Sequence, residues 1–377
     1  MEIIEFDDHY QWQGGTLPLG SKTYVERESD SNLYLFCIKT YQANRICFIL
    51  AARQMGKSSL MVAVGNKLKE QNIKSVFINL QSMGGGNAVN SARVLWLSLL
   101  VQICKSLDNS EYLLSKLEEY LKNYEYLTSG QIFIDFLSEE ILSSTTYKKI
   151  IVFIDEIQSL RSWNLQEEFL ACIRSISDNV SNNVLHKLSF VLIGVSKPSD
   201  LVIGKGAKLN IGIQIKLDYL GKDCIPLRDG LREISNNCER TFSRIYYWTN
   251  GQPFLTQHLC YELAKRRQFI PDLNHEFYID SIVKKNLLEQ WRTEDPQSHF
   301  QEIENSFLRY DENIQTALKM LSEYELIVQG SSICWKYDSE LHADLIISGI
   351  VIKINEHQVE TLKISNPIYQ SYIQQVI

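Results

Sequence analysis

Apolar runs and helical repeats alternate along the first 217 residues. Five runs have the length of buried strands, at 46–50, 75–80, 150–154, 188–194 and 213–217. Apolar residues recur at helical spacing in six segments, at 30–42, 58–71, 92–106, 112–121, 130–142 and 165–178. Strands that alternate with helical crossovers form mainly parallel sheets with helices on both faces. We therefore predict an α/β domain at 28–221, preceded by an N-terminal arm at 1–27.

The pattern then becomes wholly helical, and we predict a helical lid at 222–290. A polar stretch with a proline at 291–296 predicts a linker. Helical segments follow, and then two candidate strands, 349–354 and 359–364, across a turn at 355–357. Two strands joined by a short turn after helices predict a winged-helix domain at 297–377.

The first candidate functional motif lies between the strand at 46–50 and the helix at 58–71. Residues 51–59, AARQMGKSS, match the phosphate-binding pattern G-x-x-x-x-G-K-[ST], except that Ala51 replaces the first glycine. Gly56 lets the backbone approach a phosphate, Lys57 adds a positive charge, and Ser58 offers an oxygen to Mg²⁺. Alanine is small, so we expect the turn to form at some strain. The strand–loop–helix context favours a phosphate site over a chance match at a helix start.

A second candidate follows the apolar strand at 150–154, which ends in Asp155 and Glu156. A strand this apolar belongs in the middle of a covered sheet, where ligands bind at the carboxyl ends of the strands. Asp155 is suited to hold Mg²⁺ and Glu156 to polarise an attacking water. A solvated turn after the strand is the alternative, and the loop upstream argues against it.

Composition narrows the class of protein. The formal net charge of −7 argues against a general nucleic-acid or anionic-membrane partner. Eight cysteines are scattered singly without metal-ligand spacing, which favours reduced core residues such as Cys47, Cys104 and Cys260. The acidic start of the chain lacks a signal-peptide layout, and no apolar run approaches the ~18 residues of a membrane span. We expect a cytoplasmic protein.

Further motifs accompany these two: GGTLPL at 14–19, YVER at 24–27, IGVSKPSDL at 193–201, WTNGQPFLT at 248–256, LIISGIV at 345–351 and NPIYQS at 366–371. Together with RQMGKSSL at 53–60 and FIDEI at 153–157, they resemble the AAA-like domain family of STAND-type signalling ATPases. This family belongs to the AAA+ and origin-recognition-like branch of P-loop ATPases. The resemblance covers nearly the whole chain, and it implies that ATP and Mg²⁺ bind.

The resemblance also implies roles for single residues. It implies a nucleotide-binding set that comprises Tyr24, Val25, Arg27, Gln54, Met55, Gly56, Lys57, Ser58, Ser59, Gly251 and Pro253. Ser58 and Asp155 would hold the metal. Glu156, Lys57 and Ser196, at the sensor position, would be catalytic. Two alternatives stay open: Ser196 as a helix-capping hydroxyl, and residues 248–253 as an ordinary helix–turn–helix corner.

One departure from the family concerns arginine. Related ATPases often present an arginine from near the fourth and fifth strands to a neighbour's γ-phosphate, which stabilises the transition state. The sequence has no arginine between Arg174 and Arg228. We therefore predict slow hydrolysis, unless Arg174 or a partner protein supplies the charge.

Three functions remain as hypotheses. The first is a switch that hydrolyses ATP slowly and changes lid position or assembly state. The second is a DNA-associated initiator or transposition-type ATPase. The third is a pseudo-ATPase that only binds ATP, and the replacement of the first glycine by Ala51 favours it. Residues 301–377 carry 5 Lys+Arg against 11 Asp+Glu, a net charge of 5 − 11 = −6. The candidate recognition helix at 339–347 contains Glu340 and Asp344 but no basic residue, whereas groove-reading helices need basic residues. Protein docking or self-assembly through this acidic domain is therefore favoured over DNA binding.

Overall fold

The computed structural model of the 377-residue chain describes residues 10, 15–39, 45–84, 89, 91–179, 184–197, 200, 212–266, 268–289, 299–301, 303–304, 314–356 and 358–376. The chain clusters into two compact units. The sheet unit comprises Glu28–Ala51 and Leu60–Leu217, and the lid unit comprises Met1–Arg27, Ala52–Ser59 and Asp218–Ile377. The linker predicted at 291–296 lies outside the described residues.

Parallel strands in the order β2-β3-β4-β1-β5 form the sheet of the sheet unit. Their bounds are β1 (Ile46–Leu50), β2 (Ile73–Asn79), β3 (Lys149–Asp155), β4 (Leu188–Gly194) and β5 (Ile213–Gln214). Every residue of β1, β3 and β4 is buried, as expected for central strands covered on both faces. The prediction of a parallel α/β sheet is confirmed.

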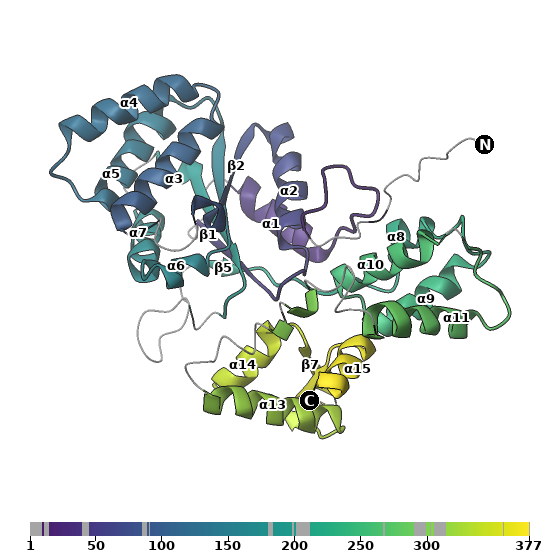
Figure 1. The fold of residues 1–377 in the computed structure, drawn as a ribbon. Coiled ribbons are helices and arrows are strands. Elements are labelled where there is room, and N and C mark those ends of the chain that lie inside the picture. The colour runs from purple at the N-terminus through teal and green to yellow at the C-terminus, as the bar shows by residue number, and fades with distance from the viewer. Residues whose placement is uncertain are drawn as a thin grey trace. The chain divides into compact units, whose positions relative to one another are not determined.

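Helices cover both faces of this sheet (Figure 1). Helices α3, α5 and α7 share an apolar cluster with one face, and α1 and α2 lie on the other. The helices are α1 (Glu28–Ile38), α2 (Lys57–Lys67), α3 (Ala92–Ser106), α4 (Ser110–Asn123), α5 (Ser129–Phe136), α6 (Ser159–Ser162) and α7 (Gln166–Asp178). Three short 3₁₀ helices are η1 (Leu68–Gln71), η2 (Leu80–Met83) and η4 (Leu185–Lys187), and η3 (Leu137–Leu142) is a π-helical segment.

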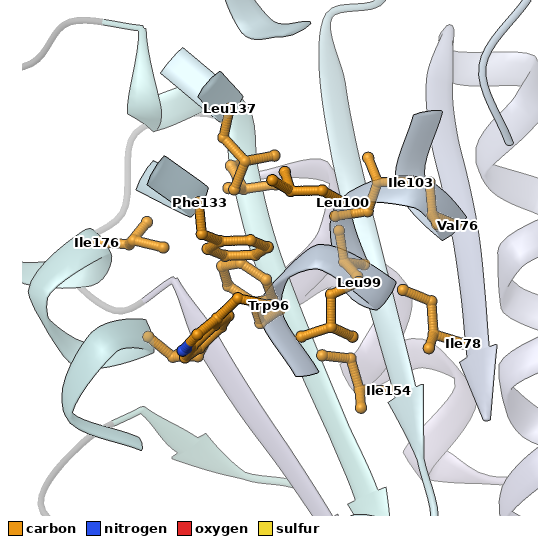
Figure 2. Close-up of a cluster of buried hydrophobic side chains, with 14 of the residues drawn as sticks. Val76, Ile78, Trp96, Leu99, Leu100, Ile103, Phe133, Leu137, Ile154 and Ile176 are labelled. Atoms are coloured by element: carbon orange, nitrogen blue, oxygen red, sulfur yellow. The ribbon is translucent and has the colours of Figure 1, made fainter. Parts of the chain in front are cut away.

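Trp96 of α3 lies at the centre of the packing between helices and sheet. Its indole stacks on Phe169 of α7 at a centroid distance of 5.4 Å and lies 4.6 Å from the ring of Phe133 of α5. Figure 2 shows the rings of Trp96 and Phe133 in one buried cluster with the aliphatic side chains of Ile154 in β3 and Ile78 in β2. Close packing of large side chains holds α3, α5 and α7 against the sheet and so sets where its strands end.

The edge strand is shorter than predicted. β5 pairs with β1 only through Ile213 and Gln214, although residues 213–217 read as a strand. One more backbone bond, from Ile215 N–H to Phe48 O at 2.9 Å, continues the contact. An edge strand has a partner on one side only, so its ladder ends as soon as the chain leaves that partner.

The first part of the lid unit after the sheet is helical within its described residues. It contains α8 (Ile225–Asp229), α9 (Cys238–Thr249), α10 (Pro253–Ala264), α11 (His275–Ile282) and the π-helical segment η6 (Val283–Glu289). Helices α9 and α10 meet at a corner formed by Asn250, Gly251 and Gln252. This corner contributes to the candidate site below.

The C-terminal part combines helices with a small antiparallel sheet in the order β6-β8-β7. Its elements are α13 (Ile314–Val328), β6 (Ile333–Cys334), α14 (Glu340–Ile347), β7 (Val351–Glu356), β8 (Val359–Ile364) and α15 (Pro367–Val376). This element order agrees with the expected winged helix. The turn prediction was wrong in part, because the ladder extends to the pair Glu356–Val359 and places Asn355 and Glu356 in β7.

Two expectations from composition can be compared with the structure. Cys47, Cys104 and Cys260 are buried thiols without disulfide partners, as the scattered spacing suggested. Among the described helices, none combines the length and the apolar character needed to cross a bilayer.

Candidate functional site

The loop after β1 connects the central strand Ile46–Leu50 to the first residue of α2, Lys57. Two of its residues have left-handed backbone conformations, Gln54 with φ 57° and Gly56 with φ 79°. Ala51 does not, and its N–H donates to Gly194 O at 3.2 Å, continuing the contact with β4. The expected strain at Ala51 is therefore absent, because the loop places its left-handed turns further along the chain.

The lysine of the motif is held close to its own loop. Lys57 is 7% exposed, and its Nζ donates to Ala52 O at 2.6 Å. The hydroxyl of Ser59 accepts a bond from Leu17 N–H at 2.9 Å, which ties the N-terminal arm to the start of α2. The N-terminus of α2 offers backbone N–H groups and a positive dipole end, which favour an anion.

Arg27, at the end of the arm, lies against the loop. Its Nη1 donates to Met55 O at 2.9 Å and to Asp218 O at 3.0 Å. A Cβ added at Gly56 would lie 3.1 Å from Arg27 Nη2, so glycine lets the guanidinium and the loop approach each other. Arg27 thus joins three chain segments that are far apart in sequence.

The corner between α9 and α10 supplies a further contact to the loop. Gly251 has φ 75°, and a Cβ there would lie 2.1 Å from Leu220 O, so only glycine fits. The Oε1 of Gln252 accepts from Leu255 N–H at 2.6 Å and caps α10, while its Nε2 donates to Gln54 O at 3.4 Å. Pro253 occupies the first turn of α10, where its missing N–H costs nothing.

These segments line one pocket within the lid unit. Its walls combine apolar side chains with polar groups from the arm, the loop and α10: Gly15, Leu17, Thr23, Tyr24, Val25, Arg27, Gln54, Gly56, Ser59, Leu220, Pro253, Phe254 and Gln257. A mostly apolar cleft with a few polar groups is typical of a small-molecule site.

The pocket brings together part of the predicted nucleotide-binding set. Seven of those residues line it: Tyr24, Val25, Arg27, Gln54, Gly56, Ser59 and Pro253. Met55, Lys57, Ser58 and Gly251 are not among its walls, although Met55 and Lys57 belong to the same loop. The remaining walls were not predicted from the sequence: Gly15, Leu17, Thr23, Leu220, Phe254 and Gln257. Phe254 lies within the 248–256 motif, but neither it nor the GGTLPL motif had been given a role.

The carboxylates of Asp155, the last residue of β3, and of Glu156 lie in the sheet unit. Asp155 is 4% exposed, and its Oδ1 accepts from Glu156 N–H at 2.8 Å. Glu156 has φ 60°, a left-handed conformation that is uncommon for a residue with a side chain. Gln158, which the sequence analysis missed, donates to the Glu156 carboxylate and accepts from Val195 N–H at 3.1 Å. Gln158 therefore positions Glu156 relative to the end of β4.

Ser196 follows β4 and is 6% exposed. Its hydroxyl lies 3.3 Å from Asp200 Oδ2, and the same carboxylate oxygen accepts from Lys197 N–H at 3.0 Å. In both of its described contacts the Ser196 hydroxyl faces an oxygen, Asp200 Oδ2 or Lys197 O, whereas a capping hydroxyl accepts from a backbone N–H. Pro198 and Ser199 of the motif lie outside the described residues.

Arg174 does not reach beyond its own helix in the described contacts. It lies 3.4 Å from Asp178, one turn further along α7, and both side chains are more than half exposed. Such surface pairs contribute little to stability. Among the described residues, no group of three or more His, Cys, Asp or Glu side chains is placed to hold a metal ion.

Sequence comparison gives a match along most of the chain. The profile of the family described as AAA-like domain matches residues 12–375. An uncharacterised WD repeat-containing protein of Synechocystis sp. is 28% identical over 374 residues, which is 95% of this chain and 29% of that protein. The chain thus spans less than a third of the length of this curated relative.

Structural comparison gives distant similarities. The ORC2 protein of Aeropyrum pernix, in ADPNP–ADP complexes, has a TM-score of 0.45 at 11% identity, covering 98% of this chain and 96% of that chain. Domain III of the Thermotoga maritima replication initiation protein DnaA has a TM-score of 0.36 at 15% identity, covering 70% and 96%. The strand order β2-β3-β4-β1-β5 defines the fold.

Proposed function

The chain belongs to the AAA-like domain family, and from this premise we propose that it is an ATP-binding switch of the STAND type. ATP and Mg²⁺ bind at the loop 51–59, hydrolysis is slow, and the bound nucleotide sets the position of the lid or the state of assembly. The observation that carries the proposal is the pocket beside the phosphate-binding loop, where the arm, the loop and α10 meet.

The pocket suits a base and the loop suits its phosphates. Leu17, Leu220 and Phe254 offer apolar surface for a flat ring. In the proposed complex, Lys57 exchanges its bond to Ala52 O for phosphate oxygens, and the N-terminus of α2 faces the same anion. The bond that Lys57 makes to its own loop preserves the position of the ammonium group for this exchange.

The two residues proposed as metal ligands carry oxygen groups of the kind that Mg²⁺ binds. This ion takes oxygen ligands and is usually held by one or two carboxylates with substrate phosphates, so it needs no dense acidic cluster. Ser58 offers a hydroxyl and Asp155 a buried carboxylate. Mg²⁺ would neutralise charge on the phosphates. Glu156, oriented by Gln158, accepts a proton from the attacking water or orients it.

The contacts of the loop support a switch. Gln252 bonds to Gln54 O, so a change in the loop alters a contact of the lid. A Cβ added at Gly349 would lie 3.0 Å from Ala52 Cβ, and Tyr219 OH donates to Gly349 O at 3.2 Å. The C-terminal part therefore also lies against the loop, and a loop that rearranges around phosphates would disturb it.

Nucleotide binding is tested by titrating the full chain with ATP and Mg²⁺. We expect Lys57→Ala to weaken binding by about tenfold to a hundredfold, as expected when a charge-assisted hydrogen bond is lost. Lys67→Ala, at the other end of α2, is the matched control and should bind like wild type. Absence of ATP binding by the wild type would refute the proposal.

Hydrolysis is tested separately with Glu156→Gln. We expect this variant to bind ATP like wild type and to lose ADP formation by a factor of about 10² or more, the contribution of a general base. Glu167→Gln, exposed in the first turn of α7, is the control. A wild type that retains ATP unhydrolysed would instead support the binding-only pseudo-ATPase.

The acidic C-terminal part supports a protein partner or self-assembly. Helix α14 carries Glu340 and Asp344 and lacks basic residues, which disfavours contact with DNA phosphates. Light scattering of the full chain in the apo, ADP and ATP-analogue states tests assembly. We expect the mass or the hydrodynamic radius to depend on the nucleotide. Salt-sensitive binding of duplex DNA would favour the initiator-type alternative.

A further inference from the structure

One wall of the pocket presents an amide in a defined orientation. Gln257 lies in α10, one turn after Pro253, and is 8% exposed. Its Nε2 donates to Thr23 Oγ1 at 2.6 Å. Both residues line the pocket, together with the apolar surface of Leu17, Leu220 and Phe254.

Thr23 is itself held in place. It is 2% exposed, its hydroxyl lies 3.0 Å from Ser21 Oγ, and Tyr24 N–H bonds to Ser21 O in a turn at 3.2 Å. Helix α10 is anchored at its start by the Gln252 cap. The Thr23 hydroxyl has a single hydrogen. When that hydrogen is donated to Ser21 Oγ, Thr23 Oγ1 can only accept, and the NH₂ end of the Gln257 amide is then the end that bonds to it.

The other end of the amide is open. Within the described part of the chain, Gln257 Oε1 accepts no hydrogen bond, and it is not among the side-chain atoms sealed from solvent. The pocket therefore contains a carbonyl oxygen with an unused acceptor site on a side chain that lines it. A fixed acceptor distinguishes ligands by what they present at that position, because a second acceptor there would be left unpaired.

Resting on the proposed function, we propose that Gln257, held by Thr23, determines the base specificity of the site and selects adenine. Adenine carries an amino group, a donor, at C6, and guanine carries a carbonyl oxygen, an acceptor, at the same position. Gln257 Oε1 accepts from the adenine amino group. Guanine would place its O6 against Oε1, and both oxygens would lose their bonds to water.

Three nucleotides that differ at C6 of the base isolate the contribution of the bond to Gln257 Oε1. ATP has the 6-amino group, purine riboside triphosphate has only hydrogen there, and GTP has an oxygen. Competition against a fluorescent ATP analogue measures all three affinities on the full chain. For the wild type we expect ATP to bind about three- to tenfold more tightly than purine riboside triphosphate, the value of one neutral hydrogen bond. GTP should bind more weakly than both.

Gln257→Leu removes the acceptor and should make ATP and purine riboside triphosphate bind equally. Thr23→Val keeps the acceptor but releases the amide, which can then turn and offer its NH₂ to guanine. This variant should therefore raise GTP affinity relative to ATP, which a merely structural role for Thr23 would not do. Gln329→Leu, at an exposed residue directly after α13, should keep the wild-type ratios.

The outcomes discriminate between the two proposals. If no nucleotide binds the wild type, the proposed function fails. If the wild type binds all three triphosphates equally, or if Gln257→Leu keeps the preference for ATP over purine riboside triphosphate, nucleotide binding stands and the role of Gln257 is refuted. Should Gln257→Leu lose its native circular dichroism, the ratios measured for Thr23→Val decide alone.

Discussion

In the sheet unit, the core around Trp96 is built from apolar and aromatic side chains, whereas the lid unit buries the imidazoles of His258, His275, His299 and His342. Several of the buried polar groups in the lid unit pair across long stretches of sequence. Thr241 Oγ1 lies 2.8 Å from His275 Nε2, and His299 Nε2 lies 2.8 Å from Tyr369 OH. Apolar packing is non-directional, but each of these bonds requires a defined geometry.

The difference bears on function. The parallel sheet is covered on both faces and holds Asp155 and Glu156 rigidly at the end of β3. The pocket of the lid unit is instead held by hydrogen bonds between the arm, the loop and α10, which can break and form again. Phe254, a pocket wall, lies 4.9 Å from His299 between ring centroids, and His299 stacks in turn on Tyr369 of α15. The pocket wall is thus continuous with a buried polar contact to the C-terminal helix.

The largest expected effect is in the sheet unit. Trp96→Ala should lower the free energy of unfolding by about 3–5 kcal/mol, because it leaves a cavity beneath α5 and α7. Urea unfolding, monitored through amide exchange in α3 and β3, measures the change in the free energy of unfolding. Tyr126→Ala, at a side chain that is 80% exposed in the same unit, should change it little. Equal losses for the two variants would contradict a core centred on Trp96.

In the lid unit, the largest loss of stability is expected where a substitution forces an unfavourable backbone conformation. Gly251→Ala forces a side chain into a left-handed conformation at a cost of about 1–3 kcal/mol, and its Cβ also collides with Leu220 O. Gly221→Ala is the control, because its Cβ would meet no atom within 4 Å. Amide exchange in α9 and α10 should accelerate for Gly251→Ala alone, with β1–β4 unchanged.

Low pH should destabilise the lid unit more than the sheet unit. Burial lowers the pKa of His299 from the ordinary 6.5 to about 3, with His258 as the nearby like charge, so this imidazole stays neutral in the fold. The unfolded chain takes up a proton near pH 6.5, so the stabilisation is complete above that pH and is lost as the pH falls towards 3. At pH 5 the loss is about 2 kcal/mol.

This loss should appear as faster amide exchange in α10 and α15 at pH 5, after correction for intrinsic rates, with a smaller change in β3. His299→Phe leaves Tyr369 OH without its partner and is less stable at pH 7, but it should flatten the pH dependence. A steeper dependence in the sheet unit than in the lid unit would contradict the comparison.

The smallest effect is expected at Ala51. Because this residue is not in a left-handed conformation, Ala51→Gly relieves no strain and should lower stability by about 0.4–1 kcal/mol through the entropy of the unfolded chain. ATP affinity should change less than about threefold, a small fraction of the effect of one lost charge-assisted bond. A tenfold gain in affinity would show that the missing glycine limits binding.

The same contrast explains what could be predicted from the sequence. The apolar runs at 46–50 and 188–194 match β1 and β4 residue for residue, because a buried parallel strand leaves a continuous apolar signal. β6 was missed, since its two residues are too few to show a period. Candidate phosphate-loop and carboxylate residues could be proposed from the sequence because their chemistry follows local spacing. Gln257 and Thr23 were not, because a bond across 234 residues leaves no local pattern.

The central claim is that nucleotide binds where the arm, the loop and the α9–α10 corner meet. Hydrogen exchange of the full chain, with and without a non-hydrolysable ATP analogue and Mg²⁺, tests it directly. We predict slower exchange in 15–27, 52–59 and 250–257 together, and no such protection in Lys57→Ala at the same concentration. Unchanged exchange in these three segments at a saturating concentration of the analogue would contradict the claim.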